Sequence, residues 1–291
     1  MDRIETYTRS LVCHLSEDSL GKGRRLLLCG LLFFIFVFHL SVSDSLAELI
    51  KSRAAVVMDA STGEILYSKD SDRQLPPAST TKLMTAILTI ESKSLSDVVT
   101  ISKYASHVRP FKARLKEGNR LTVEGLLYAS LLKSANDAAV ALAEAVAGSE
   151  ERFVDLMNQK AFSLGATNTR FINSTGLPGP DQYSTAADLA RILGYAIRYP
   201  KLKEIIGTPV TRVSTEGGRV LSLRNTDKLL WSDEDVIGGK TGFTGSAGHC
   251  FVCAAEHKTK TIIVAILGSS SRKNLWKETE KLIAIGFDKH I

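Results

Sequence analysis

The sequence is poor in the residues that form disulfide frameworks and metal centres. It has four cysteines among 291 residues, and Cys13 and Cys29 both precede residue 30. Cys250 and Cys253 lie in a segment that is typical of a β-strand, where an odd separation places two side chains on opposite faces and disfavours a disulfide. The histidines of the chain body show no spacing typical of zinc ligands. We therefore expect no metal and no cofactor.

Basic runs interleaved with aromatic residues are also missing, which argues against nucleic-acid binding. The net charge is +6. Residues 1–47 contain equal numbers of basic and acidic groups, so the excess lies in residues 48–291. Basic charge spread in this way favours anionic partners such as wall polymers. The chain contains no internal repeat, low-complexity tract or linker, and its 44% hydrophobic content is typical of a globular protein with a sizeable core.

The apolar run at residues 26–40 is too short to span a bilayer comfortably, because a transmembrane helix needs about 20 residues. A basic patch precedes it, and the small residues Ser45 and Ala47 follow it. This order is typical of an export signal, here cleaved after Ala47. The 21 residues before the basic patch are long for such a signal, so an uncleaved signal anchor stays open. Either alternative predicts an extracytoplasmic protein, in the periplasm or cell-wall space. An uncleaved segment would be its only possible attachment to a membrane.

Hydrophobic periodicity and turn residues predict strands at both ends of the chain and helices between them. The predicted elements are a β-hairpin at 54–70, a helix from Ser79, two helical segments within 121–148, a helix after Ser149, a helix from Thr185 to about Tyr199, β structure from 208 to 269 and an amphipathic helix at 274–287. This order indicates an α+β fold, in which strands from both ends form one antiparallel sheet and the middle helices form a lobe.

Ser79 and Lys82 are three residues apart near a helix start, so their side chains should lie on the same side. Ser-x-x-Lys occurs four times in the chain, so it indicates little alone. The chain also contains a single Ser-x-Asn, at 134–136, and a single Lys-Thr-Gly, at 240–242. The ordered set of SxxK, SxN and KTG is that of penicillin-binding proteins and serine β-lactamases.

Longer segments narrow the resemblance. They are "PASTTKLMTAILTIE", "LLKSANDAAVALAEAVAGSEERFVDLMN", "LGATNTRFINSTGL", "YSTAADLARI" and "GGKTGFTGSAGHC". From about Arg53 to Phe287 the chain resembles the low-molecular-weight penicillin-binding proteins of the D-alanyl-D-alanine carboxypeptidase family, peptidase S11. The resemblance implies a β-lactamase-like antiparallel sheet flanked by helices and a D,D-peptidase catalytic domain at residues 48–291. Because the sequence stops at Ile291, we expect no C-terminal stalk domain.

The resemblance also implies catalytic roles. Ser79 is the nucleophile, Lys82 is its base, and Ser134 carries the proton to the departing amine. Lys82 can act only when it is neutral, and both burial and repulsion from Lys240 would lower its pKa. The pair would then be a Ser–Lys variant of the Ser-His-Asp arrangement.

Further residues are implied to bind substrate. Asn136 would hydrogen-bond the substrate amide, while Lys240 and Thr241 hold the terminal carboxylate. Gly242 would let the peptide add as an extra strand, and the N–H groups of Ser79 and Phe243 would bind the oxyanion. Arg224 matches the family arginine near the carboxylate, although a surface arginine is an equal alternative.

The predicted activity is removal of the terminal D-alanine from peptidoglycan stem peptides through an acyl-enzyme on Ser79, with β-lactams as covalent inhibitors. The first alternative is a D,D-endopeptidase that cuts peptidoglycan cross-links, because "RNT" and the residues after KTG look more like that branch. A β-lactamase is less favoured, since no Glu-x-x-Leu-Asn segment lies between SxN and KTG. A catalytically silent wall-binding module is disfavoured by the intact motif set.

Overall fold

The computed structural model describes residues 50–110 and 112–288 of the chain. The predicted export signal, residues 1–47, lies outside the described residues. Within those residues, no helix is both long and apolar enough to cross a membrane.

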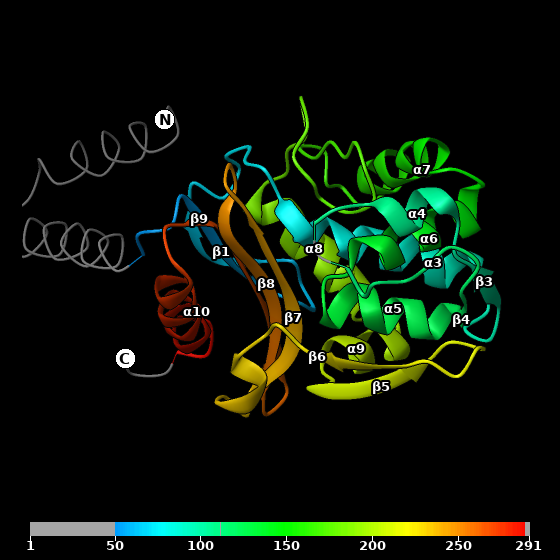
Figure 1. Ribbon diagram of the computed structural model, residues 1–291. Helices are drawn as coiled ribbons and strands as arrows, with labels where there is room; N and C mark the ends of the chain where they lie inside the picture. The colour runs from blue at the N-terminus through cyan, green and yellow to red at the C-terminus, as the bar shows by residue number, and fades with distance from the viewer. Residues whose placement is uncertain (1–49, 111, 289–291) are drawn as a thin grey trace, which may run out of the picture. The chain divides into compact units, whose positions relative to one another are not determined.

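A five-stranded antiparallel sheet forms the centre of the described residues (Figure 1). Its strands are β1 (Ala54–Asp59), β2 (Ile65–Lys69), β7 (Val236–Thr244), β8 (Gly248–His257) and β9 (Lys260–Ser269). Their order is β2-β1-β9-β8-β7, and every neighbouring pair is antiparallel. The prediction that strands from both ends of the chain share one sheet is therefore confirmed, because β1 pairs with β9.

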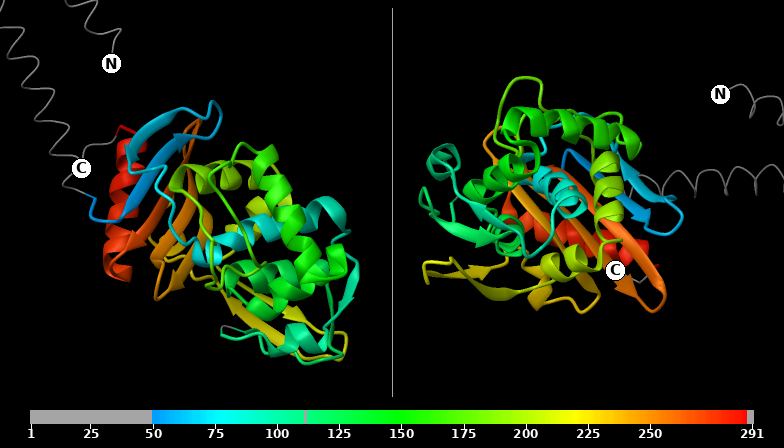
Figure 2. Two further views of the ribbon diagram at one scale, coloured as in Figure 1. Left: turned by 90° about the horizontal axis from the view of Figure 1, so that it is seen from above. Right: turned by 90° about the vertical axis from the view of Figure 1, so that its right-hand side faces the viewer.

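Helices cover both faces of this sheet (Figures 1 and 2). The lobe on one face contains η1 (Ala78–Thr81), α3 (Lys82–Ser92), α4 (Lys103–His107), α5 (Val123–Leu132), α6 (Asn136–Ala147), α7 (Glu150–Ser163), α8 (Ala186–Ala196) and α9 (Pro200–Ile206). Two small two-stranded sheets and the turn η2 (Leu229–Trp231) complete the fold. One sheet pairs β3 (Val98–Thr100) with β4 (Arg120–Thr122), and the other pairs β5 (Val210–Ser214) with β6 (Val220–Arg224).

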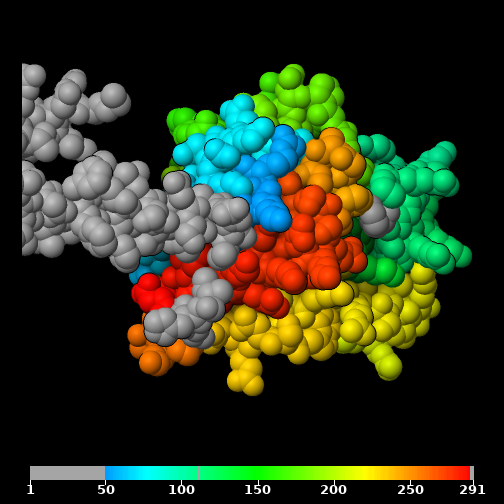
Figure 3. Space-filling model, turned by 90° about the vertical axis from the view of Figure 1, so that its left-hand side faces the viewer, coloured from blue at the N-terminus to red at the C-terminus, as the bar shows by residue number. Residues whose placement is uncertain are grey.

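The C-terminal helix α10 (Arg272–Gly286) packs on the other face of the sheet. Its buried residues Leu275 and Leu282 belong to a second hydrophobic core, between α10 and the sheet. Ile285 and Phe287 pack against this core, as the amphipathic pattern predicts. Figure 3 shows this face, with α10 in red beside the first described residues in blue. The sheet therefore has a hydrophobic core on each side.

The two cysteines among the described residues lie on opposite faces of β8. Cys250 belongs to the core under the helical lobe, and Cys253 belongs to the core under α10. Both thiols are free and buried. The strand alternation that the sequence predicts is confirmed by this arrangement.

Capping residues set several helix starts. Ser149 Oγ accepts the N–H of Arg152 at 3.3 Å, and Thr185 Oγ1 accepts the N–H of Asp188 at 3.0 Å, as the sequence predicts. The helix that was expected to reach about Tyr199 ends at Ala196 instead. Tyr199 is extended because it precedes Pro200, which starts α9.

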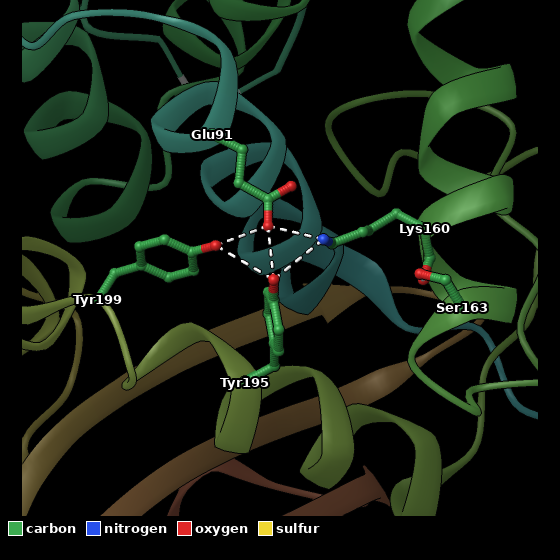
Figure 4. Close-up of polar contacts among 5 residues, drawn as sticks. All are labelled: Glu91, Lys160, Ser163, Tyr195 and Tyr199. Atoms are coloured by element: carbon green, nitrogen blue, oxygen red, sulfur yellow. Dashed lines mark hydrogen bonds and ion pairs between the residues drawn. The ribbon is translucent and has the colours of Figure 1, made fainter.

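A carboxylate ties three segments of the lobe together at the end of α3 (Figure 4). Glu91 accepts hydrogen bonds from Lys160 Nζ at 2.6 Å and from the hydroxyls of Tyr195 and Tyr199 at 2.7 Å each. Lys160 lies on α7, Tyr195 lies on α8 and Tyr199 follows α8. We call these four residues the Glu91 cluster.

Candidate active site

Ser79 lies in the short 3-10 turn η1, immediately before α3, rather than inside the α-helix that the sequence predicts. Ala78 has a left-handed backbone with φ of 49°. The turn rests against Gly176, where an added Cβ would lie 1.7 Å from the carbonyl oxygen of Ala78. Only glycine fits at that position, so the loop around Gly176 fixes the backbone beneath the nucleophile.

Lys82 is fully buried, and its amine has three partners. The Nζ atom lies 3.0 Å from Ser79 Oγ, 2.7 Å from Asn136 Oδ1 and 2.5 Å from the carbonyl oxygen of Thr175. The two carbonyl oxygens can only accept hydrogen bonds. A neutral amine that gives both of its hydrogens to them keeps its lone pair for the hydroxyl of Ser79. The geometry therefore suits removal of the Ser79 proton.

Electrostatics favour the same neutral form of Lys82. Burial holds the pKa of Lys82 well below its ordinary value, and the charge of Lys240 lowers it further. Asp137 and Glu150 act in the opposite direction and raise this pKa. The net direction is the one that the sequence predicts.

The SxN residues enter the site from the break between α5 and α6. Ser134 has a left-handed φ of 60° and lines the same cleft as Ser79. Asn136 is buried, and its Nδ2 donates to the carbonyl oxygen of Pro110 at 2.6 Å while its Oδ1 accepts from Lys82. A bond from Asn136 to a substrate amide therefore depends on the second Nδ2 hydrogen, and this predicted role remains a prediction.

Strand β7 brings the KTG residues against η1. Lys240 is fully buried, and its Nζ donates to the carbonyl oxygen of Thr241 at 2.8 Å. Burial lowers the pKa of Lys240 to about 7, although the charge of Asp227 opposes this change. A Cβ added to Gly242 would lie 3.0 Å from the backbone nitrogen of Ser79, so the edge of β7 passes close to the nucleophile. Lys240 itself is buried behind Thr241, the next residue, which lines the cleft, and its predicted role in holding the substrate carboxylate remains a prediction.

A cleft of about 120 Å³ opens in front of these residues. It is lined by Ser79, Lys133, Ser134, Thr226, Thr241, Gly242, Phe243, His249, Arg272, Leu275 and Trp276. The hydroxyls of Thr226 and Thr241 lie 2.7 Å apart, and the ring of Phe243 stacks on His249 at 4.4 Å between centroids. The cleft therefore offers hydroxyls near Lys240 and an aromatic wall further along β7.

Four predicted site residues do not line this cleft: Lys82, Asn136, Lys240 and Arg224. Lys82 bonds both Ser79 and Asn136, and Lys240 is buried next to the cleft-lining Thr241 in the chain, whereas no such contact among the described residues ties Arg224 to the site. Arg224 is exposed on β6, and its guanidinium lies 4.9 Å from the centroid of the Trp231 ring. Arg272, which the sequence analysis did not single out, is the arginine that lines the cleft. It begins α10, and no spacing relates it to the three motifs, so only the tertiary fold brings it to the site.

The part of the chain that the structure describes contains no group of three or more histidine, cysteine, aspartate or glutamate residues that could hold a metal ion. The side chains that gather around Ser79 are instead a hydroxyl, two buried amines and an amide. The chemistry that this set supports is nucleophilic attack by an activated serine.

Comparison with known proteins identifies the family. The model of the family described as D-alanyl-D-alanine carboxypeptidase, peptidase S11, matches residues 41–271. The chain therefore belongs to this family, as its motifs predict.

Individual relatives agree with this assignment. The chain is 34% identical over 245 residues to the D-alanyl-D-alanine carboxypeptidase DacF of Bacillus subtilis, covering 82% of this chain and 63% of that relative. It is 34% identical to a D-alanyl-D-alanine endopeptidase of Pseudomonas aeruginosa, covering 82% of this chain and 81% of that relative. The crystal structure of the Streptomyces K15 DD-transpeptidase matches with a TM-score of 0.77 and 32% identity, covering 82% of this chain and 98% of that one. The predicted penicillin-binding-protein fold is thereby confirmed, although the chain spans less than two thirds of the length of DacF.

Proposed function

We propose that this protein is a serine-type D-alanyl-D-alanine carboxypeptidase that removes the terminal D-alanine of peptidoglycan stem peptides. The observation that supports this most directly is the buried amine of Lys82, whose two carbonyl partners leave its lone pair for Ser79. The family assignment supports the choice of substrate.

In the proposed reaction, Lys82 Nζ takes the proton of Ser79, and Oγ attacks the carbonyl carbon of the bond between the two D-alanines. The N–H groups of Ser79 and Phe243 bind the oxyanion. Ser134 then delivers its proton to the leaving nitrogen and receives in return the proton that Lys82 took from Ser79, so free D-alanine departs, Lys82 is neutral again and an ester to Ser79 remains. Water hydrolyses this ester and restores the hydroxyl of Ser79. β-Lactams would form the same ester and act as covalent inhibitors.

Substrate would lie along β7. Its terminal carboxylate would meet the hydroxyls of Thr226 and Thr241, with the charge of Lys240 behind them. Gly242 would leave room for the peptide backbone to approach the strand edge. Asn136 would bind the amide of the peptide on the acyl side.

A labelling experiment tests the nucleophile. Labelled penicillin should acylate the wild-type protein at Ser79, and Ser79→Ala should abolish the adduct while thermal unfolding stays close to that of the wild type. Ser270→Ala is the matched control, because Ser270 begins another Ser-x-x-Lys and is exposed. It should label normally. An adduct that persists in Ser79→Ala would refute the assignment of the nucleophile.

A D,D-endopeptidase is the second candidate function. The relative from Pseudomonas aeruginosa that is named an endopeptidase is matched over 81% of its length, and the cleft continues past Ser79 to Arg272 and Trp276. Mass spectrometry after incubation with a free pentapeptide and with a cross-linked dimer separates the two activities. Loss of one alanine from the pentapeptide alone indicates the carboxypeptidase, and cleavage of the dimer alone indicates the endopeptidase.

We also infer that residues 1–47 direct export, that residues 48–291 form the catalytic domain and that the enzyme acts outside the cytoplasm. The signal-like order of charged and apolar residues before Ala47 supports the first inference. The proposed substrate, a component of the cell wall, supports the last. Any membrane attachment proposed here is through residues 26–40.

A further inference from the structure

A buried carboxylate lies next to the KTG strand. Asp227, in the turn between β6 and η2, is fully buried. Its Oδ1 accepts the N–H of Leu229 at 2.9 Å, whereas its buried Oδ2 has no hydrogen-bond partner among the described residues. An unpaired buried carboxylate is costly unless a compensating charge lies nearby.

The turn that carries Asp227 is fixed to both sides of the active site. The N–H of Thr226 donates to the carbonyl oxygen of Leu132, at the end of α5 and two residues before Ser134. Thr226 Oγ1 lies 2.7 Å from Thr241 Oγ1, in the residue next to Lys240. The turn that carries Asp227 is thus held beside β7 by the hydrogen bonds of the preceding residue, Thr226.

Lys240 is the cation whose charge acts on Asp227. Its amine is fully buried, and its hydrogen-bond partner within the described residues is the neutral carbonyl oxygen of Thr241. A buried ammonium and a buried carboxylate that each lack an ionic hydrogen-bond partner stabilise one another through their charges.

We propose that Asp227 is a positioning residue for the reaction, because its buried carboxylate holds the proton on Lys240. The Lys240 ammonium can then attract the substrate carboxylate and keep Lys82 unprotonated. This inference rests on the proposed function of the site.

The electrostatic interactions run in the directions that the proposal requires. Burial lowers the pKa of Lys240 to about 7, and Asp227 opposes that change. Burial raises the pKa of Asp227 to about 7, and Lys240 opposes that change. Lys240 in turn lowers the pKa of Lys82. Asp227 therefore favours the charged form of Lys240, and the charge of Lys240 favours the neutral form of Lys82.

The other titratable group that faces Asp227 is Cys253 on β8. Burial, Asp227 and Asp233 all raise the pKa of this thiol well above its ordinary value. Cys253 is therefore a neutral thiol and adds no charge to the electrostatic interaction between Asp227 and Lys240.

Asp227→Asn tests the proposal with a side chain of nearly the same shape. The rate of acylation by labelled penicillin and the release of D-alanine are measured between pH 5 and 10. Without the charge of Asp227, Lys240 should lose its proton at lower pH, so the alkaline limb of both profiles should move down by about one pH unit. Asp233→Asn is the matched control from the following loop, and its limb should match the wild type.

Each outcome has a distinct meaning. An unchanged alkaline limb in folded Asp227→Asn, or activity that falls by the same factor at every pH, would overturn the proposal. A wild-type protein that neither binds penicillin covalently nor releases D-alanine would instead refute the proposed function. If Asp227→Asn does not fold, carbon-13 NMR of labelled aspartate carboxyls gives the reciprocal measurement. The titration midpoint of Asp227 should rise in Lys240→Met, and an equal midpoint in both proteins would overturn the proposal.

Discussion

The protonation state of Lys82 decides whether the candidate site can react. Its pKa is held well below 10.5 by burial and by Lys240, and below that pKa the amine carries a proton and cannot accept another from Ser79. We therefore expect kcat/KM for a D-alanyl-D-alanine peptide to rise with pH through an apparent pKa far below that of free lysine. A profile that rises only near pH 10 would contradict the role of Lys82 as the base.

Lys82→Arg separates the charge of this residue from its packing. Arginine is always protonated, so it cannot take the proton of Ser79. Because a general base contributes about 100-fold or more, kcat/KM should fall by at least that factor. Lys277→Arg, an exposed change on α10, is the control and should retain activity. Peptide hydrolysis measured at the optimum pH of the wild type gives the comparison, and near-normal turnover by Lys82→Arg would exclude Lys82 as base.

At this scale the sequence could predict the side chains of the motifs but not every partner. Ser79 and Lys82 are three apart, and that spacing is enough to expect their hydrogen bond. The carbonyl oxygen of Thr175, which orients the amine, belongs to the backbone of a distant loop. A backbone carbonyl leaves no residue-type signal, so its role emerges only from the structure.

Among the elements, α3 is attached at both ends by polar groups: Lys82 bonds Asn136 and Thr175 at its start, and the Glu91 cluster lies near its end. Burial opposes ionisation of Glu91, but the hydrogen bonds from Lys160, Tyr199 and Tyr195 hold its pKa below the ordinary value of 4.5. The cluster should therefore stabilise the packing of α3 on α7 and α8.

Glu91→Gln should lower the free energy of unfolding by about 1 to 2 kcal/mol at pH 7, because the three donors lose a charged acceptor. A carboxylate with a depressed pKa in the folded state stabilises the protein above its unfolded pKa. The difference between the variant and the wild type should therefore disappear as the pH falls through the folded pKa of Glu91. Urea unfolding at several pH values measures it.

Glu280→Gln, an exposed change on α10, is the control and should unfold like the wild type. A Glu91→Gln protein as stable as the wild type at pH 7 would contradict a structural role for the cluster. Penicillin acylation should remain normal in this variant, since Glu91 lies at the far end of α3 from Ser79.

The limits of the elements show which sequence signals are reliable. Ser149 and Thr185 start helices as expected because each supplies its own side-chain cap. The start of α3 was less predictable, since the left-handed Ala78 and the 3-10 turn are imposed by the loop around Gly176. A helix cap can be predicted because the capping residue and the N–H group it binds are close in the sequence. The turn before α3 cannot, because it depends on a contact between segments that are distant in the sequence.

For the whole molecule, the antiparallel sheet could be predicted from the positions of the β patterns at the two ends of the chain. The far wall of the cleft could not, because Arg272 and Trp276 reach it only when α10 packs under the sheet. Their place in the cleft depends on how the helical lobe and α10 pack at β7. No periodicity in the sequence predicts that packing.

The state of the N-terminus in cells is a prediction about the whole protein. If residues 1–47 are a cleaved export signal, the mature protein should begin near Glu48 and be held to anionic wall polymers by its positive charge. A high-salt wash should release it, because the Debye length, over which charges attract one another, falls from about 10 Å at 0.1 M salt to about 3 Å at 1 M. N-terminal sequencing of the released protein checks this expectation. An intact leader on protein that only detergent releases would indicate a signal anchor.

The pairing of β1 with β9 also determines when the domain can form. Ala54–Asp59 must wait for Lys260–Ser269, about two hundred residues later, before the middle of the sheet closes. Until then the apolar edge of β1 has no lasting neighbour except β2, and pairing over such a long stretch of chain is slow. A nascent chain that lacks β9 therefore cannot complete the sheet. If the protein is exported as proposed, that delay would keep the polypeptide unfolded until nearly all of it has crossed the membrane.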